Sequence, residues 1–301
     1  WYNETANTIK VESETTAGAW ATSGSLNTAR SDMGGAGTQT AALGFAGSNS
    51  ATTETYNGSA WTEVNDLNTA RASIGGCGAT NTAALAYGGK TPPNNKQTLT
   101  ESWNGTNWTE VNDLNAAKSS MAGFGIQTAA LSVGGVMAPA TGQVAQTETW
   151  NGTNWTELND LNTARESLRG AGITTAGLVF GGYASTLTPT ATAITESWNG
   201  TNWTEVADLN TGRYSVASAG IQAAAIAAGG GNASGQHAIT ELWNGSAWTE
   251  VADLNTARES VTGAAPSTAA LAFGGFVPPL TTATEEWTGA GSPVIRTITT
   301  D

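Results

Sequence analysis

The stretch that decides the fold is residues 100–118, TESWNGTNWTEVNDLNAAK. It holds two short Thr- and Trp-containing runs, which are separated by Asn104 and Gly105 and followed by a Leu-Asn segment that ends at Lys118. Runs of Thr, Val and Trp bounded by Gly and Asn are typical of strands, and an Asn-Gly pair between two such runs indicates a hairpin turn. The stretch therefore predicts an antiparallel strand pair followed by a connecting segment.

This pattern recurs along the chain of 301 residues. The basic residues that end the Leu-Asn segments are 41, 47, 47, 48 and 45 residues apart. They are Arg30, Arg71, Lys118, Arg165, Arg213 and Arg258. After each comes a glycine-rich stretch and then a small apolar run that ends in a glycine pair in five of the six units, as in TAALAYGG at 82–89. Four strands per unit is the simplest interpretation, and no window keeps a helical period.

Six four-stranded units bury their sheets against one another when they are arranged radially, which predicts an all-β, six-bladed β-propeller. The two ends of the chain indicate how the ring closes. The last unit carries its first aromatic, Trp287, but has Ser292 where the second is expected, whereas the N-terminus carries Trp20 and has Thr15 where the first is expected. We therefore expect the N-terminal strand around Trp20 to complete the last blade, since an open ring would leave unpaired sheet edges. The predicted organisation is an N-terminal extension at 1–16, the propeller at 17–291 and a C-terminal extension at 292–301.

The glycine pair, the paired aromatics and the Arg before the first strand resemble the kelch repeat, over roughly residues 17–291. The chain departs from that pattern because its two tryptophans are five residues apart, as at Trp103 and Trp108. The near-identical, Thr/Asn/Gly-rich copies are similar to kelch-type repeats of marine tailed-phage and bacterial surface proteins. The resemblance implies a module that is virion-associated or extracellular.

Composition excludes several classes of function. The formal net charge is −13 with only 11 Lys and Arg residues, whereas nucleic-acid binding requires concentrated positive charge. No apolar run approaches a membrane span, so no membrane insertion is expected. One cysteine, Cys77, and one histidine, His237, leave little material for a metal site or a catalytic triad, and the carboxylates are mostly repeated rather than unique to one place. We expect no enzyme activity and no cofactor.

The six copies act as an internal comparison, because a residue present in every blade serves what every blade needs. By this criterion the tryptophans pack between blades, although sugar stacking is the alternative. The repeated carboxylates form turn hydrogen bonds and pair locally with Arg or Lys, with a solvated surface or a ring of calcium ligands as alternatives. Cys77 is a small buried group, and the sequons such as Asn57-Gly-Ser are explained by turn chemistry.

Variation is confined to the segments between the glycine pair and the next Glu, which run from 6 to 13 residues. In a propeller these second-to-third strand connections lie on the same face as the links between blades. Variation between repeats on one face is typical of a binding surface, and unselected drift is the alternative. The candidate binding side chains on this loop face are Lys90, Asn95, Lys96, Gln143, Tyr183 and His237.

Arg169 breaks the repeat elsewhere, since the equivalent positions hold Gly, Ala or Thr. On an inner strand it is expected either to line the central channel, where it could bind an anion, or to reach solvent at a strand end. Together these residues predict a non-enzymatic binding or structural module, most simply a virion component that decorates a capsid or forms part of a tail or fibre. The alternative is a secreted bacterial adhesin or a glycan-binding propeller. The expected partners are proteins of an assembly or a surface glycan.

Overall fold

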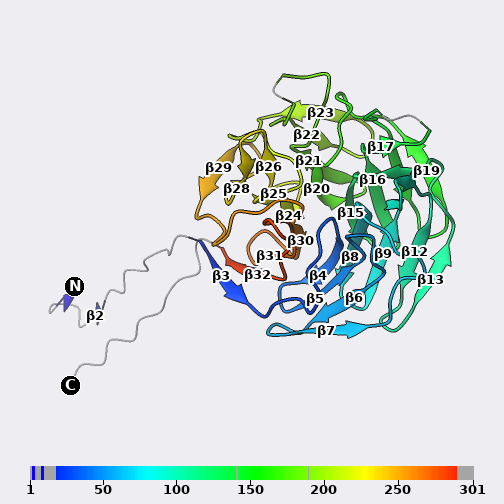
Figure 1. Ribbon diagram of the computed structural model, residues 1–301. Helices are drawn as coiled ribbons and strands as arrows, with labels where there is room; N and C mark the ends of the chain where they lie inside the picture. Colours follow the sequence, from blue (N-terminus) through cyan, green and yellow to red (C-terminus); the bar gives the residue numbers. More distant parts are fainter. Residues whose placement is uncertain (1, 4–7, 10–17, 140–141, 189, 290–301) are drawn as a thin grey trace.

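The computed structural model describes residues 2–3, 8–9, 18–139, 142–188 and 190–289, and the predicted propeller is confirmed in them. Six four-stranded antiparallel sheets stand around a central axis, with β4, β8, β15, β20, β24 and β30 nearest the centre (Figure 1). The described residues contain no helix. A separate pair, β1 (Tyr2–Asn3) and β2 (Thr8–Ile9), precedes the ring. Most of the predicted terminal extensions lies outside the described residues.

In the first five blades the chain runs from the inner to the outer strand. The first three blades are β4 (Gly34–Thr38), β5 (Ala41–Phe45), β6 (Thr53–Tyr56) and β7 (Trp61–Val64); β8 (Gly75–Thr80), β9 (Ala83–Tyr87), β12 (Thr100–Trp103) and β13 (Trp108–Val111); and β15 (Ala122–Ile126), β16 (Ala129–Val133), β18 (Thr147–Trp150) and β19 (Trp155–Leu158). The next two are β20 (Arg169–Ile173), β21 (Ala176–Phe180), β22 (Thr195–Trp198) and β23 (Trp203–Val206); and β24 (Ala217–Ile221), β25 (Ala224–Ala228), β28 (Thr240–Trp243) and β29 (Trp248–Val251).

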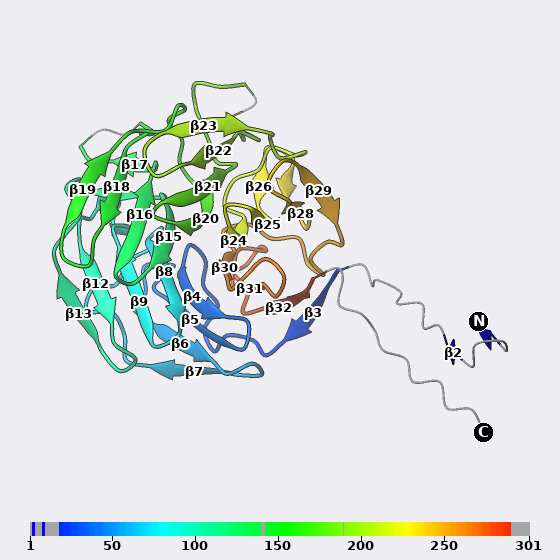
Figure 2. The same cartoon turned by 180° about the vertical axis from the view of Figure 1, so that it is seen from behind.

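The sixth blade closes the ring with strands from both ends of the chain. It consists of β30 (Thr262–Ala264), β31 (Leu271–Phe273), β32 (Thr284–Thr288) and β3 (Ala19–Ser23) as its outer strand. β3 pairs with β32 in antiparallel register and places Trp20 opposite Trp287. Figure 2 shows this junction from behind, with the blue β3 beside the red β32. The complementary aromatics of the two ends therefore identified the closing strand correctly.

The outer tryptophans join each blade to the preceding one. The indole Nε1 of Trp108 donates a hydrogen bond to Thr53 Oγ1 of the first blade at 3.1 Å, and the same bond recurs in every blade. At the closure the bond runs from Trp20 to Thr240 at 2.9 Å. The tryptophans other than Trp1 are all buried, with at most 7 % of any side chain exposed. Packing is confirmed as their role, and their burial excludes sugar stacking on these rings.

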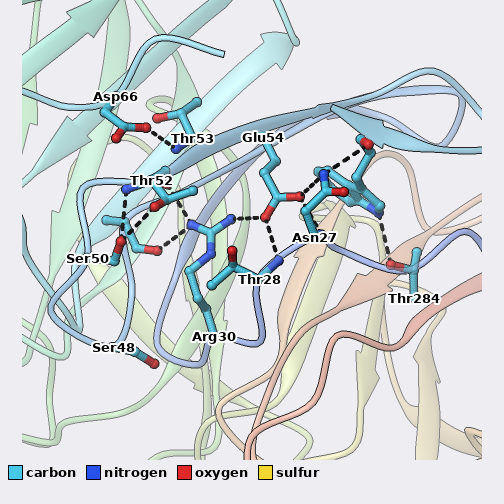
Figure 3. A network of polar contacts seen from close by, with 12 residues as sticks. Asn27, Thr28, Arg30, Ser48, Ser50, Thr52, Thr53, Glu54, Asp66 and Thr284 are labelled. Carbon is cyan, nitrogen blue, oxygen red and sulfur yellow. Dashed lines mark hydrogen bonds and ion pairs between the residues drawn. The ribbon is translucent and has the colours of Figure 1, made fainter. Parts of the chain in front are cut away.

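Each blade contains a buried ion pair, and Figure 3 shows the one in the first blade, where it holds the base of the variable loop. In the first blade Arg30 Nη2 lies 2.8 Å from Glu54 Oε1, while Nη1 donates to the carbonyl oxygens of Ala46 and Thr52, where the loop begins and ends. The other oxygen of Glu54 accepts hydrogen bonds from the backbone and side-chain amides of Asn27. All six blades contain the ion pair, at 2.6–3.2 Å. We call this arrangement the loop clamp.

The repeated aspartate bonds to a strand rather than within its own turn, since Asp113 Oδ1 accepts the backbone N–H of Thr100 at the start of β12 at 3.0 Å. The sequon asparagines act as predicted, because Asn57 Oδ1 accepts the backbone N–H groups of Ser59 and Ala60. Cys77 is buried, and burial raises the pKa of its thiol to about 12. These repeated features therefore belong to the scaffold and leave the loop face and the channel as places for a site.

Candidate functional site

The variable loops and the links between blades lie on one face, as predicted, because their backbones are hydrogen-bonded to each other. The link residue Ala72 exchanges hydrogen bonds with Lys90 of the second blade's loop, and Glu166 does the same with Tyr183 in the fourth. Two short strand pairs, β10 (Lys90–Thr91) with β11 (Asn95–Lys96) and β26 (Gly231–Asn232) with β27 (Gly235–Gln236), lie within loops. A third, β14 (Lys118–Ser119) with β17 (Val136–Met137), joins a link to a loop.

The links themselves vary at the residue that directly follows the basic residue of the clamp. This position holds Ser31, Ala72 and Ser119 in the first three blades and Glu166, Tyr214 and Glu259 in the last three. All three larger side chains are half-buried on the loop face. The links therefore carry small side chains in the first three blades and large polar ones in the last three.

These link residues connect with the loops into one continuous set of contacts. Gln143, from the third blade's loop, donates to Glu166 Oε1 of the fourth blade at 2.8 Å and accepts from Ser185 Oγ at 2.7 Å. Gln236, from the fifth blade's loop, donates to Glu259 Oε1 of the sixth at 3.3 Å. We call this set the polar arc, and its members are Gln143, Glu166, Tyr183, Tyr214, Gln236 and Glu259.

Two tyrosines form the middle of the polar arc. The rings of Tyr183 and Tyr214 meet edge to face with their centroids 6.4 Å apart. The carboxylate of Glu259 lies beside the ring of Tyr214. It occupies the space that a side chain at position 231 would fill, since a Cβ on Gly231 would come within 2.0 Å of Glu259 Oε2. Burial, then the negative charge of Glu259, raises the pKa of Tyr214, so its hydroxyl is protonated at neutral pH.

The chemistry of the arc follows from its unused hydrogen-bonding capacity. Within the described residues, neither Glu166 nor Glu259 forms an ion pair, and each carboxylate is only partly engaged by a glutamine. Two aromatic faces flanked by carboxylates and amides suit a cationic or hydroxyl-rich ligand. Half-buried tyrosines also supply contact area at a small cost in side-chain entropy.

The structure separates the predicted binding residues into groups. Gln143 and Tyr183 belong to the polar arc, whereas Lys90, Asn95 and Lys96 lie in the β10–β11 hairpin of the second blade, with Lys90 opposite Lys96. No hydrogen bond in the described part of the chain links that hairpin to the arc.

His237 lies at the base of the fifth blade's loop, where its backbone N–H donates to Gly230. Its Nε2 is buried and has no hydrogen-bond partner among the described residues. Burial, then the positive charge of Arg213, lowers the pKa of its imidazole. It is therefore neutral at pH 7 and belongs to the loop base rather than to the exposed contact surface.

Arg169, the half-buried first residue of β20, borders the cavities of the central channel. Three contiguous cavities run along the axis, with volumes of about 10, 50 and 120 Å³ from the loop face to the opposite face. Arg169 borders the first two. The inner strands are too close for larger side chains elsewhere, since a Cβ on Gly263 would come within 2.3 Å of the Ser218 carbonyl oxygen.

Sequence reasoning missed Glu166, Tyr214 and Glu259, although a signal was present. These residues follow the invariant basic position and differ from blade to blade, which is the same criterion that identified the loops. The loops were distinguished by their length as well, whereas the links vary at one position only.

The part of the chain that the structure describes contains no group of three or more His, Cys, Asp or Glu side chains that could hold a metal ion. It also contains no helix long and apolar enough to cross a membrane.

Searches against known proteins give no match, either to a protein-family model or to a curated sequence. The fold and site therefore define the class: a six-bladed β-propeller compatible with protein binding.

Proposed function

We propose that this chain is a non-enzymatic binding module that holds a protein partner through its loop face, with the polar arc as the main contact. The observation that carries this proposal is that side chains from four successive blades converge on the arc while the rest of each blade repeats. A scaffold requirement would apply to all six blades, so a feature confined to one half of the face points to recognition. Burial and shape favour Tyr183 and Tyr214 as the anchoring residues.

The setting that we propose is a virion, in which the propeller decorates a capsid or forms part of a tail or fibre and contacts neighbouring proteins or a host surface. This part rests on the resemblance of the repeats to kelch-type repeats of tailed-phage proteins. The absence of enzyme activity is also proposed, because within the described residues the single histidine lies at a loop base and its Nε2 has no hydrogen-bond partner. We expect neither nucleic acid nor membrane lipid as a partner, in line with the acidic charge.

The arc can be removed without changing the scaffold, because other blades show what its positions tolerate. Tyr214→Ala gives the fifth blade the residue of the second, Ala72, and Glu166→Ser gives the fourth blade the residue of the third, Ser119. The matched control is Ile221→Ala, which removes an exposed side chain at the end of inner strand β24. It lies beside the β24–β25 turn, on the face opposite the loops.

The test is in two stages. Mass spectrometry and cryo-electron microscopy of purified particles locate the chain, and competition with the isolated propeller measures its affinity for the particle. Tyr214→Ala should weaken competition by about thirtyfold, as expected for an anchoring side chain, and Ile221→Ala should not. The proposal fails if Tyr214→Ala competes like the wild type, or if the contacts map to the opposite face.

Replacement of loop 183–195 by the first blade's SNSATT tests the loop itself. Surface connections change length at small free-energy cost. In the first blade the short loop is held at both ends by the clamp residue Arg30. The variant should therefore keep its melting temperature within a few degrees and lose binding. Full binding by the shortened protein would contradict the assignment.

A secreted bacterial adhesin or glycan-binding propeller is the second candidate, and the Tyr183–Tyr214 pair is what favours it. Tyrosine rings flanked by amides and carboxylates bind the apolar faces and the hydroxyl groups of sugars. A glycan array probed with the isolated propeller distinguishes the candidates, since a glycan signal that Tyr214→Ala abolishes would support the adhesin. No signal on the array, together with presence in particles, would support the virion component.

A further inference from the structure

Arg169 occupies an inner-strand position that the other blades fill with small residues. It is the first residue of β20, and its equivalents are Gly34, Gly75, Ala122, Ala217 and Thr262. Because these residues fit the same place in the ring, packing does not require an arginine there. The guanidinium borders both the mouth cavity and the middle cavity, of about 10 and 50 Å³.

Among the described residues, Arg169 is the one cation inside the ring without an ion-pair partner. Each basic residue of the loop clamps lies within 3.2 Å of a Glu oxygen. The hydrogen bond that the structure shows for Arg169 is from Nη1 to the carbonyl oxygen of Leu168 at 3.2 Å. Burial lowers the pKa of its guanidinium, and the more distant Asp32 partly offsets that effect. Its other donors have no hydrogen-bond partner among the described residues.

The middle cavity suits an anion. Asp32 lines only the mouth, and the described lining of the middle cavity contains no carboxylate. Ser218 and Thr262 line it too, but their hydroxyls donate to the carbonyl oxygens of Gly170 and Met33. The donors left for an anion are therefore the Arg169 guanidinium and backbone N–H groups of the inner-strand glycines. The inner strands are sheet edges, so part of their backbone N–H groups point into the channel without a strand partner.

A ring of serines leads from the loop face to this cavity. Ser73, Ser120, Ser167 and Ser215 line the mouth, each with a positive φ of 53–58°. Their backbones are hydrogen-bonded from one blade to the next, as from Ser120 N–H to the Ser73 carbonyl oxygen at 2.8 Å. No hydrogen bond of the described residues uses these four hydroxyls, which leaves them free to solvate an ion that enters.

We propose that Arg169 holds one small oxyanion, a carboxylate or a phosphate, in the middle of the channel. The guanidinium is half-buried and has no ion-pair partner, and a bound anion would supply one. The planar fork of arginine matches the two oxygens of such a group. The site is separate from the polar arc and does not depend on the proposed function.

The test measures thermal unfolding in buffered sodium chloride and after replacement of the chloride by sodium phosphate or sodium acetate at constant ionic strength and pH. At about a hundred times the dissociation constant, the effective anion should raise the melting temperature of the wild type by about 5 °C. Arg169→Ala, which copies the third and fifth blades, should remove this rise. Thr109→Glu on the exposed outer strand β13 changes the net charge equally and should keep it.

Two further readouts separate a bound anion from general salt effects. In chloride alone, Arg169→Ala should be as stable as the wild type or more stable, because it removes an unpaired charge. In NMR spectra, the Nε–Hε signal that Arg169→Ala removes should shift in a saturable way as phosphate or acetate is added. The proposal is overturned if neither oxyanion raises the melting temperature, if Arg169→Ala keeps the rise, if that variant is less stable in chloride, or if the signal does not move.

Discussion

The interior of the blades and the loop face are built from the same six repeats, but they vary in different ways. In the interior, the Trp–Thr bond between blades and the buried ion pair recur in every blade. On the loop face, neighbouring blades differ in both loop and link. The clamp connects the two regions. In the first, second and fifth blades its arginine binds the first and last carbonyl groups of the loop and leaves the residues between them free to vary.

This comparison teaches that constancy in the interior is what permits variation on the face. A loop whose two ends are fixed can change in length and sequence at little cost to the sheet below it. This division can be tested at the ring closure, at the clamp, and at a single side chain where the loop face meets the clamp. The expected effect on stability decreases in that order.

The largest effect is expected from opening the ring. Deletion of residues 1–25 removes β3, its five-residue pairing with β32 and the Trp20–Thr240 bond, and leaves the β32 edge exposed. We expect aggregation or a loss of cooperative unfolding, measured by size-exclusion chromatography and calorimetry. Deletion of 1–16 is the matched control and should unfold like the wild type. A 1–25 deletion that stays monomeric with an unchanged melting temperature would contradict closure by β3.

Breaking one clamp should have the next largest effect. Arg71→Leu leaves Glu101 buried without its cation and removes the side-chain hydrogen bonds to the Gly88 and Leu99 carbonyl oxygens, of which Leu99 keeps the backbone N–H of Gly88. The free energy of unfolding should fall by about 3–5 kcal/mol in denaturant titrations. Arg71→Leu combined with Glu101→Leu should cost less than the single change, because the unpaired charge is gone. A loss below about 1 kcal/mol for the single change would show that the clamp is unimportant.

The fold and the site differ in how far the sequence predicts them. Blade number, closure and loop face follow from spacing and from the complementary aromatics at the two ends. The spacing does not show which repeated carboxylate pairs with the basic residue. Arg30 and Glu54, for example, meet only when the link and two strands of the blade are folded together. The grouping of Gln143 and Tyr183 away from Lys90, Asn95 and Lys96 depends on the path of each loop backbone, which composition does not specify.

The third blade offers a prediction of opposite sign. Its clamp uses Lys118, whose Nζ lies 3.2 Å from Glu148 Oε1 and makes one long contact, 3.5 Å, to the Ser132 carbonyl oxygen. Lys118→Arg should add the two loop-base hydrogen bonds that Arg71 makes in the second blade. The unfolding free energy should rise by about 1–2 kcal/mol, since each bond contributes about 1 kcal/mol. A destabilised Lys118→Arg variant would show that the third blade has no room for the guanidinium.

The smallest effect concerns His237, where the loop face meets the clamp. Because burial and Arg213 lower the pKa of its imidazole, the unfolded chain takes up a proton at a higher pH than the folded chain does. The stability from a neutral His237 is thus complete above the usual pKa of about 6.5 and is lost as the pH falls from there toward the lowered folded value. His237→Gln, which copies Gln97 at the corresponding place, removes this titration. Denaturant titrations between pH 7.5 and 5 should show similar stabilities at the upper end and a shallower decline for the variant. A wild type that gains stability over His237→Gln as the pH falls would mean that the imidazole has an acidic partner.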